Sequence, residues 1–233
     1  MTERSLQEFF DTLHSTQQAN RAKFPVWYDI IERIDRCFVR AGKNLVKLQS
    51  PMTGAFLLRC QYAFKTAAGM ALAGQVVEAF VMQRSLLEYA GYALLICKTP
   101  SLEGVFLGRH ANTKAMKTQR EAFKIGPVKV AVRRCDTMLA DIFVEDYEQS
   151  INFGGHPNPH GALSAIVRDE RDGLNSLTVL AISNEPRIVE HALKCTAQVG
   201  LTALCVLQHV FKEKFELLGI RQEIDALKAS GLL

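Results

Sequence analysis

The sequence has little proline, no paired-cysteine motif and no long uninterrupted apolar run. Seven prolines occur in 233 residues, and no Gly-, Ser- or Pro-rich run could act as a linker, so we expect one domain over 1–233. The six cysteines lack CxxC spacing and lie in apolar surroundings, which predicts reduced thiols in a cytoplasmic protein. Charges interrupt the apolar stretches 55–77 and 86–97, and residues 1–14 do not resemble a signal peptide. We therefore expect no membrane segment.

Motifs that identify common enzyme classes are also missing. There is no P-loop, GxGxxG, GxSxG or HExxH motif, and no ExxH pair of the kind that binds di-iron. We therefore expect no cofactor and no metal, and the sequence leaves open whether the chain is an enzyme. The net charge of +4 permits an anionic partner, but without stronger clustering it disfavours nucleic acid.

Helical periodicity dominates what is present. The pattern predicts a mainly α fold, a multi-helix bundle of about seven helices, with breaks at proline and glycine. The predicted helices span about 5–18, 26–48, 52–72, 75–98, 101–124, 127–150 and 186–218, with a short tail helix at about 221–229. The helices at 75–98 and 186–218 are apolar on nearly every face, which is typical of central helices.

One region departs from the helical period. LSAIV (163–167) and LTVLAI (177–182) are short β-rich runs joined by the charged connection RDERDGLNS. They predict a small β-hairpin insertion at about 162–183.

Arg84 and Glu88 form the first candidate site. They lie four residues apart on an otherwise apolar helical face, in an order that opposes the helix dipole. A buried charge needs a partner. The pair is therefore either a structural ion pair between helices or the wall of a pocket, where Arg84 holds an anion and Glu88 orients a histidine.

The segment FGGHPNPHG (153–161) is the second candidate. Its prolines exclude a helical metal pair of His156 and His160. The segment is either a rigid turn or a functional loop, since polar groups on a loop held by a rigid scaffold often form binding sites. We expect His156, Asn158 and His160 to meet Arg84 and Glu88 in one ligand-binding pocket.

Two charged faces are weaker candidates. The acids Asp141, Glu145, Asp146 and Glu148 follow the bases Lys129, Arg133 and Arg134 on the predicted helix 127–150, an order that opposes the helix dipole. A loose basic stripe on the predicted helix 101–124 comprises Lys114, Lys117, Arg120 and Lys124, and Arg109-His110 precede it. Both faces are interpreted first as solvated surface.

The Arg-Ser-Leu-Leu-Glu stretch (84–88), followed much later by the His-Pro loop, resembles all-helical bacterial proteins grouped near the HEPN ribonucleases. Those nucleases carry an arginine and, after four to six residues, a histidine on one helix. No histidine here has that arginine, and Arg187 with His191 is the nearest approach. The resemblance therefore implies a bacterial relative that is non-catalytic or differently catalytic.

Our leading prediction is a cytoplasmic binding or interaction protein of unknown role and unknown partner, for which an anionic small molecule is one possible ligand. The alternative is a nuclease or phosphoesterase-like hydrolase with His156 or His160 as general base and Glu88 or Glu145 orienting it. In that hydrolase Arg84 or Lys114 would stabilise phosphate charge, and a metal-assisted version would recruit Asp141, Glu145 and a histidine.

A third prediction is an obligate homo-oligomer, such as a homodimer, whose central helices pair between chains. Light scattering at several concentrations would show a monomer if this were wrong.

Overall fold

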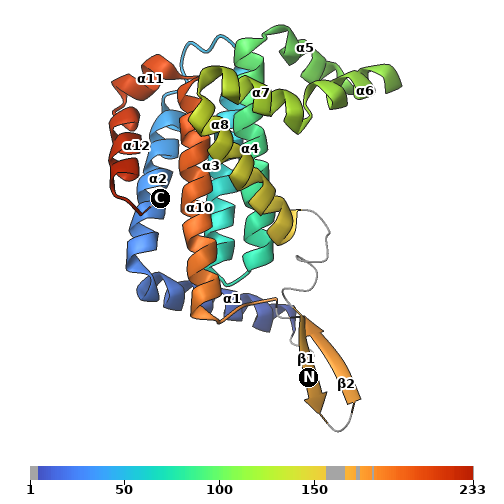
Figure 1. Cartoon of the computed structure of the whole chain (residues 1–233), viewed down its shortest axis with the longest axis vertical. Helices are drawn as coiled ribbons and strands as arrows, with labels where there is room; N and C mark the ends of the chain where they lie inside the picture. The colour runs from blue at the N-terminus through green and yellow to red at the C-terminus, as the bar shows by residue number, and fades with distance from the viewer. Residues whose placement is uncertain (1–4, 156–165, 172–173, 180, 233) are drawn as a thin grey trace.

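Three helices form the centre of the fold (Figure 1). The computed structural model describes residues 5–155, 166–171, 174–179 and 181–232. Helices α3 (Pro51–Leu72), α4 (Val76–Lys98) and α10 (Pro186–Gln208) pack against one another. The sequence-based prediction that the helices beginning near 75 and 186 are central is confirmed.

The other helices surround this centre. In Figure 1, α11 and α12 lie beside α2, α1 crosses the lower ends of the central helices, and α5 and α6 project as an arm. These helices are α1 (Leu6–Lys23), α2 (Pro25–Lys43), α5 (Ser101–Leu107), α6 (Thr113–Ala122), α7 (Ile125–Cys135), α8 (Thr137–Ser150), α11 (Lys212–Leu217) and α12 (Ile220–Ala229).

Polar caps define several helix starts. The Ser5 hydroxyl accepts from the Glu8 amide while the Glu8 carboxylate accepts from the Ser5 amide, which is a capping box. The Asn112 side chain accepts from the Ala115 amide before α6. Asp136 accepts from the Leu139 amide at 2.9 Å and so begins α8.

The predicted count of about seven helices is wrong because three predicted helices are each divided. The helix predicted at 101–124 becomes α5, a 3₁₀ turn at Gly108–His110, and α6. The one predicted at 127–150 becomes α7 and α8, and the one predicted at 186–218 becomes α10 and α11. A periodic apolar pattern continues across such breaks, so periodicity alone does not reveal them.

Strands β1 (Ile166–Arg171) and β2 (Leu174–Val179) pair antiparallel, with Ile166 opposite Val179. The predicted strand bounds are wrong, since the strands run through most of the charged connection that was expected to be a turn. Backbone hydrogen bonds rather than apolar side chains define a strand pair, so charged residues can take part.

The core is tight where glycine allows close helix contact. A Cβ on Gly200 of α10 would lie 2.4 Å from a ring carbon of Phe64 on α3. A Cβ on Gly91 of α4 would lie 2.3 Å from a methyl group of Val128 on α7. The glycines therefore let α10 approach α3, and α4 approach α7, more closely than any other residue would permit.

A buried polar contact joins α4 to α10: the Gln83 amide donates to the Thr196 hydroxyl at 3.0 Å.

Four of the six cysteines are buried, and all six are free. Within the described ranges, none of the helices combines the length and apolar character that spanning a bilayer requires. Helices α4 and α10 are covered by helices of the same chain.

Candidate functional site

Arg84 and Glu88 form a half-exposed ion pair on α4, with Tyr147 of α8 beside them. Arg84 Nε donates to Glu88 Oε1 at 2.9 Å, and the Tyr147 hydroxyl donates to the same oxygen at 3.1 Å. The Arg84 guanidinium also lies over the Tyr147 ring, 5.6 Å from its centroid. Both charged side chains are about 30 % exposed, at 30 % and 29 %. The pair is therefore open to a ligand rather than sealed in the core.

This ion pair lines a pocket of about 520 Å³ enclosed by α4, α6, α7 and α8. Cationic and aromatic groups dominate its wall, and Glu88 is its single carboxylate among the described residues. The lining comprises Arg84, Glu88, Tyr92, Arg109, Gln119, Arg120, Phe123, Lys124, Ile125, Gly126, Pro127 and Tyr147. We call it the basic pocket.

The four cationic side chains of the basic pocket differ in the ion pairs and hydrogen bonds that they make. Arg84 is tied to Glu88, and Lys124 pairs with Glu121 at 2.6 Å. Arg109 Nη1 donates to the buried, uncharged Gln119 side chain at 3.0 Å, which orients its guanidinium without neutralising it. Arg120 makes no ion pair in the part of the chain that the structure describes. The pocket therefore keeps an excess of positive charge.

The phenols of this pocket stay protonated at neutral pH. Burial, with the Glu88 carboxylate adding to it, raises the pKa of Tyr92 to about 12. Burial and the Glu88 charge also raise the pKa of Tyr147. For Arg84, burial lowers the pKa, but the hydrogen bond and charge of Glu88 outweigh it, so the pKa is raised overall. Tyr147 is therefore a hydrogen-bond donor that fixes Glu88, and Glu88 in turn fixes Arg84.

Only part of the predicted pocket can be located. Arg84 and Glu88 line one hollow, whereas His156, Asn158 and His160 lie outside the described residues. The loop's beginning is described: Phe153 stacks on Phe80 at 5.1 Å between ring centroids.

The other residues named for a hydrolase are dispersed. Glu145 lines a different pocket, between α8 and α10, and Lys114 lies at a shallow hollow on α6. Asp141 pairs with Arg133 of α7. Among the described residues, no three His, Cys, Asp or Glu side chains are arranged to hold a metal ion.

Sequence reasoning missed the partnership between α4 and the basic stripe. Arg109, Arg120 and Lys124 were interpreted as solvated surface, yet they line the same pocket as Arg84. Tyr147 was missed altogether, because a tyrosine in a mixed helix gives no sequence signal for its partner. Glu88 and Tyr147 are 59 residues apart in the chain.

The structure also explains the order of basic and acidic residues along the predicted helix 127–150. Because this segment is two helices, the bases of α7 face the acids of α8: Lys129 donates to Glu148 at 2.9 Å, and Arg133 pairs with Asp141. Arg133 and Arg134 also fall in the last turn of α7, where the helix dipole favours cations. The unfavourable charge order inferred from sequence is therefore largely removed by the break at Asp136.

Asp146 differs from its acidic neighbours because it is buried, with 7 % of its surface exposed. Its Oδ2 accepts from the Thr202 hydroxyl of α10 at 2.6 Å. Burial raises the pKa of Asp146 to about 6, although the Thr202 hydrogen bond opposes the shift.

Asp146→Asn is expected to stabilise the protein more at pH 7.5 than at pH 4.5. The folded state binds the Asp146 proton more tightly than the unfolded chain, so the wild type loses stability as pH rises from about 4 through about 6. Asparagine avoids this loss and can still accept from Thr202. The difference in unfolding free energy between variant and wild type should grow by about 2 kcal/mol over this range. Urea unfolding at both pH values measures it, with the exposed Asp141→Asn as control; a difference independent of pH would contradict the expectation.

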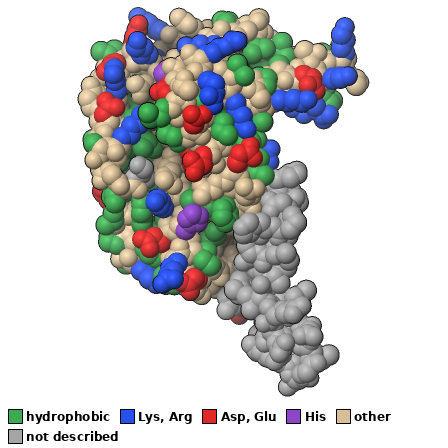
Figure 2. Space-filling model, viewed as in Figure 1, with side chains coloured by type: hydrophobic (Ala, Val, Ile, Leu, Met, Phe, Trp, Pro, Cys, Tyr) green, Lys and Arg blue, Asp and Glu red, His purple; other side chains and the backbone are tan. Residues whose placement is uncertain are grey.

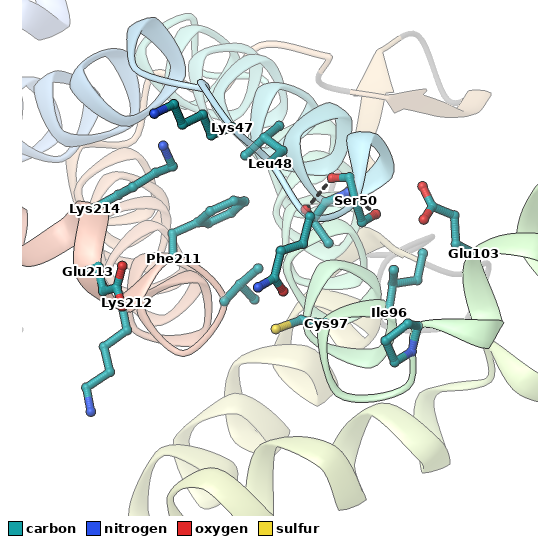
Figure 3. Close-up of a pocket in the computed structure, with 14 residues that line it drawn as sticks. Lys47, Leu48, Ser50, Ile96, Cys97, Glu103, Phe211, Lys212, Glu213 and Lys214 are labelled. Carbon is teal, nitrogen blue, oxygen red and sulfur yellow. Dashed lines mark hydrogen bonds between the residues drawn. The ribbon is translucent and has the colours of Figure 1, made fainter.

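Another hollow, of about 320 Å³, lies near the ends of α3, α4 and α11 (Figure 3). Its polar groups mainly serve the main chain. Glu103 accepts from the Met52 amide, and Lys214 donates to the carbonyls of Asn44 and Val46. Figure 3 shows Lys212 pointing away from the hollow. These contacts explain the hollow as a packing corner that ties the α2–α3 connection to α11.

The basic pocket is therefore the candidate functional site: it joins a preorganised arginine, further cations and aromatic walls in one concave surface. The chain matches no protein-family model, no curated protein sequence and no solved structure.

Proposed function

We propose that this chain is a binding protein whose basic pocket holds a small molecule bearing an oxyanion, a phosphate or a carboxylate. The observation that carries the proposal is the charge of the pocket wall, where four cations accompany a single carboxylate that is already engaged. An anionic ligand would offset the repulsion among Arg84, Arg109 and Arg120.

Arginine suits this role because its planar guanidinium donates two parallel hydrogen bonds to an oxyanion. In the basic pocket two of the three guanidinium groups are held in advance. Arg84 is fixed by Glu88 and the Tyr147 ring, and Arg109 is fixed by Gln119. A group that is already oriented loses less conformational entropy when the ligand binds. Tyr92 and Phe123 add apolar surface for the body of the ligand.

This proposal keeps the predicted role of Arg84 and changes that of Glu88, which positions Arg84 instead of orienting a histidine. A non-catalytic role also fits the resemblance to HEPN-related proteins without their Arg/His motif. The six free cysteines suit a reducing compartment, and we propose the cytoplasm as the location.

Inorganic pyrophosphate and citrate are the first probes, because they distinguish phosphate from carboxylate recognition. We expect calorimetric titration at low ionic strength to show saturable binding of one of them with Kd below about 1 mM. Arg120→Gln should raise that Kd by about tenfold, the loss of one charge-assisted hydrogen bond.

Lys117→Gln is the matched control. Lys117 lies on the same helix as Arg120, carries the same charge and is likewise exposed, but it does not line the basic pocket. In Lys117→Gln the Kd for the same probe should change less than about threefold, as expected for a screened surface charge outside the pocket. Equal effects of the two substitutions would indicate nonspecific attraction and overturn the proposal, as would the absence of binding by both probes.

A further inference from the structure

A second pocket, of about 600 Å³, lies between α8, α10 and the end of α12, and its chemistry is opposite to that of the basic pocket. We infer that it binds an organic cation, an ammonium group attached to an apolar body, with the Asp146 carboxylate as the counter-ion. The inference is independent of the proposed anion site. We call this second hollow the acidic pocket.

Asp146 is the observation that points to a cation. It is buried and lines the acidic pocket, and within the described residues its carboxylate accepts one hydrogen bond, from the uncharged Thr202 hydroxyl. No Lys, Arg or His nitrogen lies within 4.0 Å of its carboxylate in the described part of the chain. A buried carboxylate without a cationic partner is unfavourable unless a ligand supplies the charge.

The neighbouring charges decide whether the ligand is a cation. Three carboxyl groups and two lysines line the pocket, together with the exposed His191. Glu145 adds negative charge near Asp146 and raises the pKa of that carboxyl further. The other charged and titratable groups that line the pocket are Asp136, Glu145, His191, Lys194, Cys205 and Lys228, and the Cys195 thiol of α10 lies close enough to Asp146 for its charge to raise the pKa of that thiol.

The two lysines are the main competitors for Asp146. Both Lys194 and Lys228 are exposed at the rim. A lysine that folded inward would exchange a hydrated ammonium for a buried one, so its own desolvation opposes the movement. A ligand with an apolar body offsets that cost, because its body contacts the apolar wall as its ammonium group approaches Asp146.

Apolar side chains form the rest of the wall. Leu139 and Leu201 are buried, whereas Ile142 and Met138 are 45 % and 74 % exposed at the opening. Small-molecule sites commonly combine such walls with a few placed polar groups. Here Asp146 would provide charge, and Gln149 and Gln198 would provide neutral hydrogen-bond partners.

Helix geometry explains how one helix serves two opposite pockets. Asp146 and Tyr147 are consecutive on α8, and consecutive residues of an α-helix point about 100° apart. Tyr147 therefore faces α4 and the basic pocket, while Asp146 faces α10. Figure 2 shows acidic side chains among apolar ones on the face formed by α8 and α10.

Benzyltrimethylammonium and benzylamine test the inference, with benzyl alcohol as the neutral analogue. We expect NMR titration of the whole chain at pH 7.5 to give saturable shifts at α8 and α10 with both cations, and about tenfold weaker binding of benzyl alcohol. Asp146→Asn should weaken benzyltrimethylammonium at least about tenfold and leave benzyl alcohol unchanged. Asp141→Asn, on the same helix but outside the acidic pocket, should change either Kd less than about threefold.

The permanent charge of benzyltrimethylammonium allows a second readout. Its affinity should fall as the pH is lowered from 7.5 to 5, because Asp146 then becomes protonated, and Asp146→Asn should make this dependence markedly smaller. Lys194→Met, which removes a competing ammonium, should tighten binding. Equal affinity for benzyl alcohol would indicate an apolar cavity without cation recognition and overturn the inference. Unchanged cation affinity in Asp146→Asn, or no binding of either cation, would overturn it as well.

Discussion

Phe64→Ala is expected to lower the free energy of unfolding by about 3–5 kcal/mol. Phe64 of α3 is fully buried and packs against Phe38 of α2, with 5.4 Å between ring centroids. Its ring also covers Gly200 of α10. The side chain therefore fills the junction of three helices, and its removal leaves a cavity that none of them can close alone.

This loss is large compared with the total stability of a typical domain, about 5–15 kcal/mol. Urea unfolding followed by circular dichroism would measure it. Phe10→Ala is the control, because Phe10 on α1 is 53 % exposed and its removal opens no buried cavity. A change in Phe64→Ala no larger than in Phe10→Ala would show that the junction is not packed as described.

Gly200→Leu is expected to destabilise the protein by about 3 kcal/mol by overfilling the same junction. A Cβ at this position would meet Phe64 ring carbons at 2.4 and 2.8 Å and an Ile34 methyl group at 3.0 Å. Neither neighbour can move away freely, since Ile34 and Phe64 are both fully buried. The steric cost outweighs the higher helix propensity of leucine, which favours leucine over glycine by about 0.8 kcal/mol.

Gly104→Leu is the matched control for this substitution. Gly104 lies in α5, and a Cβ there would meet nothing within 4 Å. The same change should therefore leave stability unchanged or raise it slightly. If Gly200→Leu and Gly104→Leu change the free energy of unfolding equally, the close approach of α10 to α3 does not require glycine at position 200.

The double variant Phe64→Ala/Gly200→Leu links the two expectations. Leucine at 200 can occupy space that the missing ring leaves, so the two losses should not add. We expect the double variant to be more stable than the sum of the single losses predicts, by at least about 1 kcal/mol. Strict additivity would mean that the two residues do not share a site.

Much of the fold was readable from local sequence. The helices predicted at 52–72 and 75–98 are present as α3 and α4, because Ser50-Pro51 and Thr99-Pro100 place capping and helix-ending residues at their boundaries. The sequence also carries a signal for the break between α7 and α8, since Asp136-Thr137 is a good helix start. The continuous apolar pattern nevertheless suggested a single helix. Capping residues and apolar periodicity therefore predicted the helix bounds correctly where both indicated the same break, and wrongly where the periodicity continued across a cap.

The candidate site was less predictable. The sequence offered Arg84 and Glu88 either as a structural ion pair or as the wall of a pocket, and in the structure the two residues pair with each other and line the basic pocket. It could not indicate that Arg109 and Arg120 complete the wall, because those residues approach α4 only through the turns that join α5, α6 and α7. A solvated basic stripe and the wall of an anion pocket have the same residue pattern.

By itself, then, the sequence determined the helical class, the central position of the helices that begin near 75 and 186, and the position of one charged pair on α4. Tertiary structure alone decided that Glu145 is exposed while Asp146 is buried, and that Tyr147 reaches Glu88. The physical reason is that burial depends on partners distant in the chain. Thr202 is 56 residues from Asp146, and no local pattern on α8 records which of its faces α10 will cover.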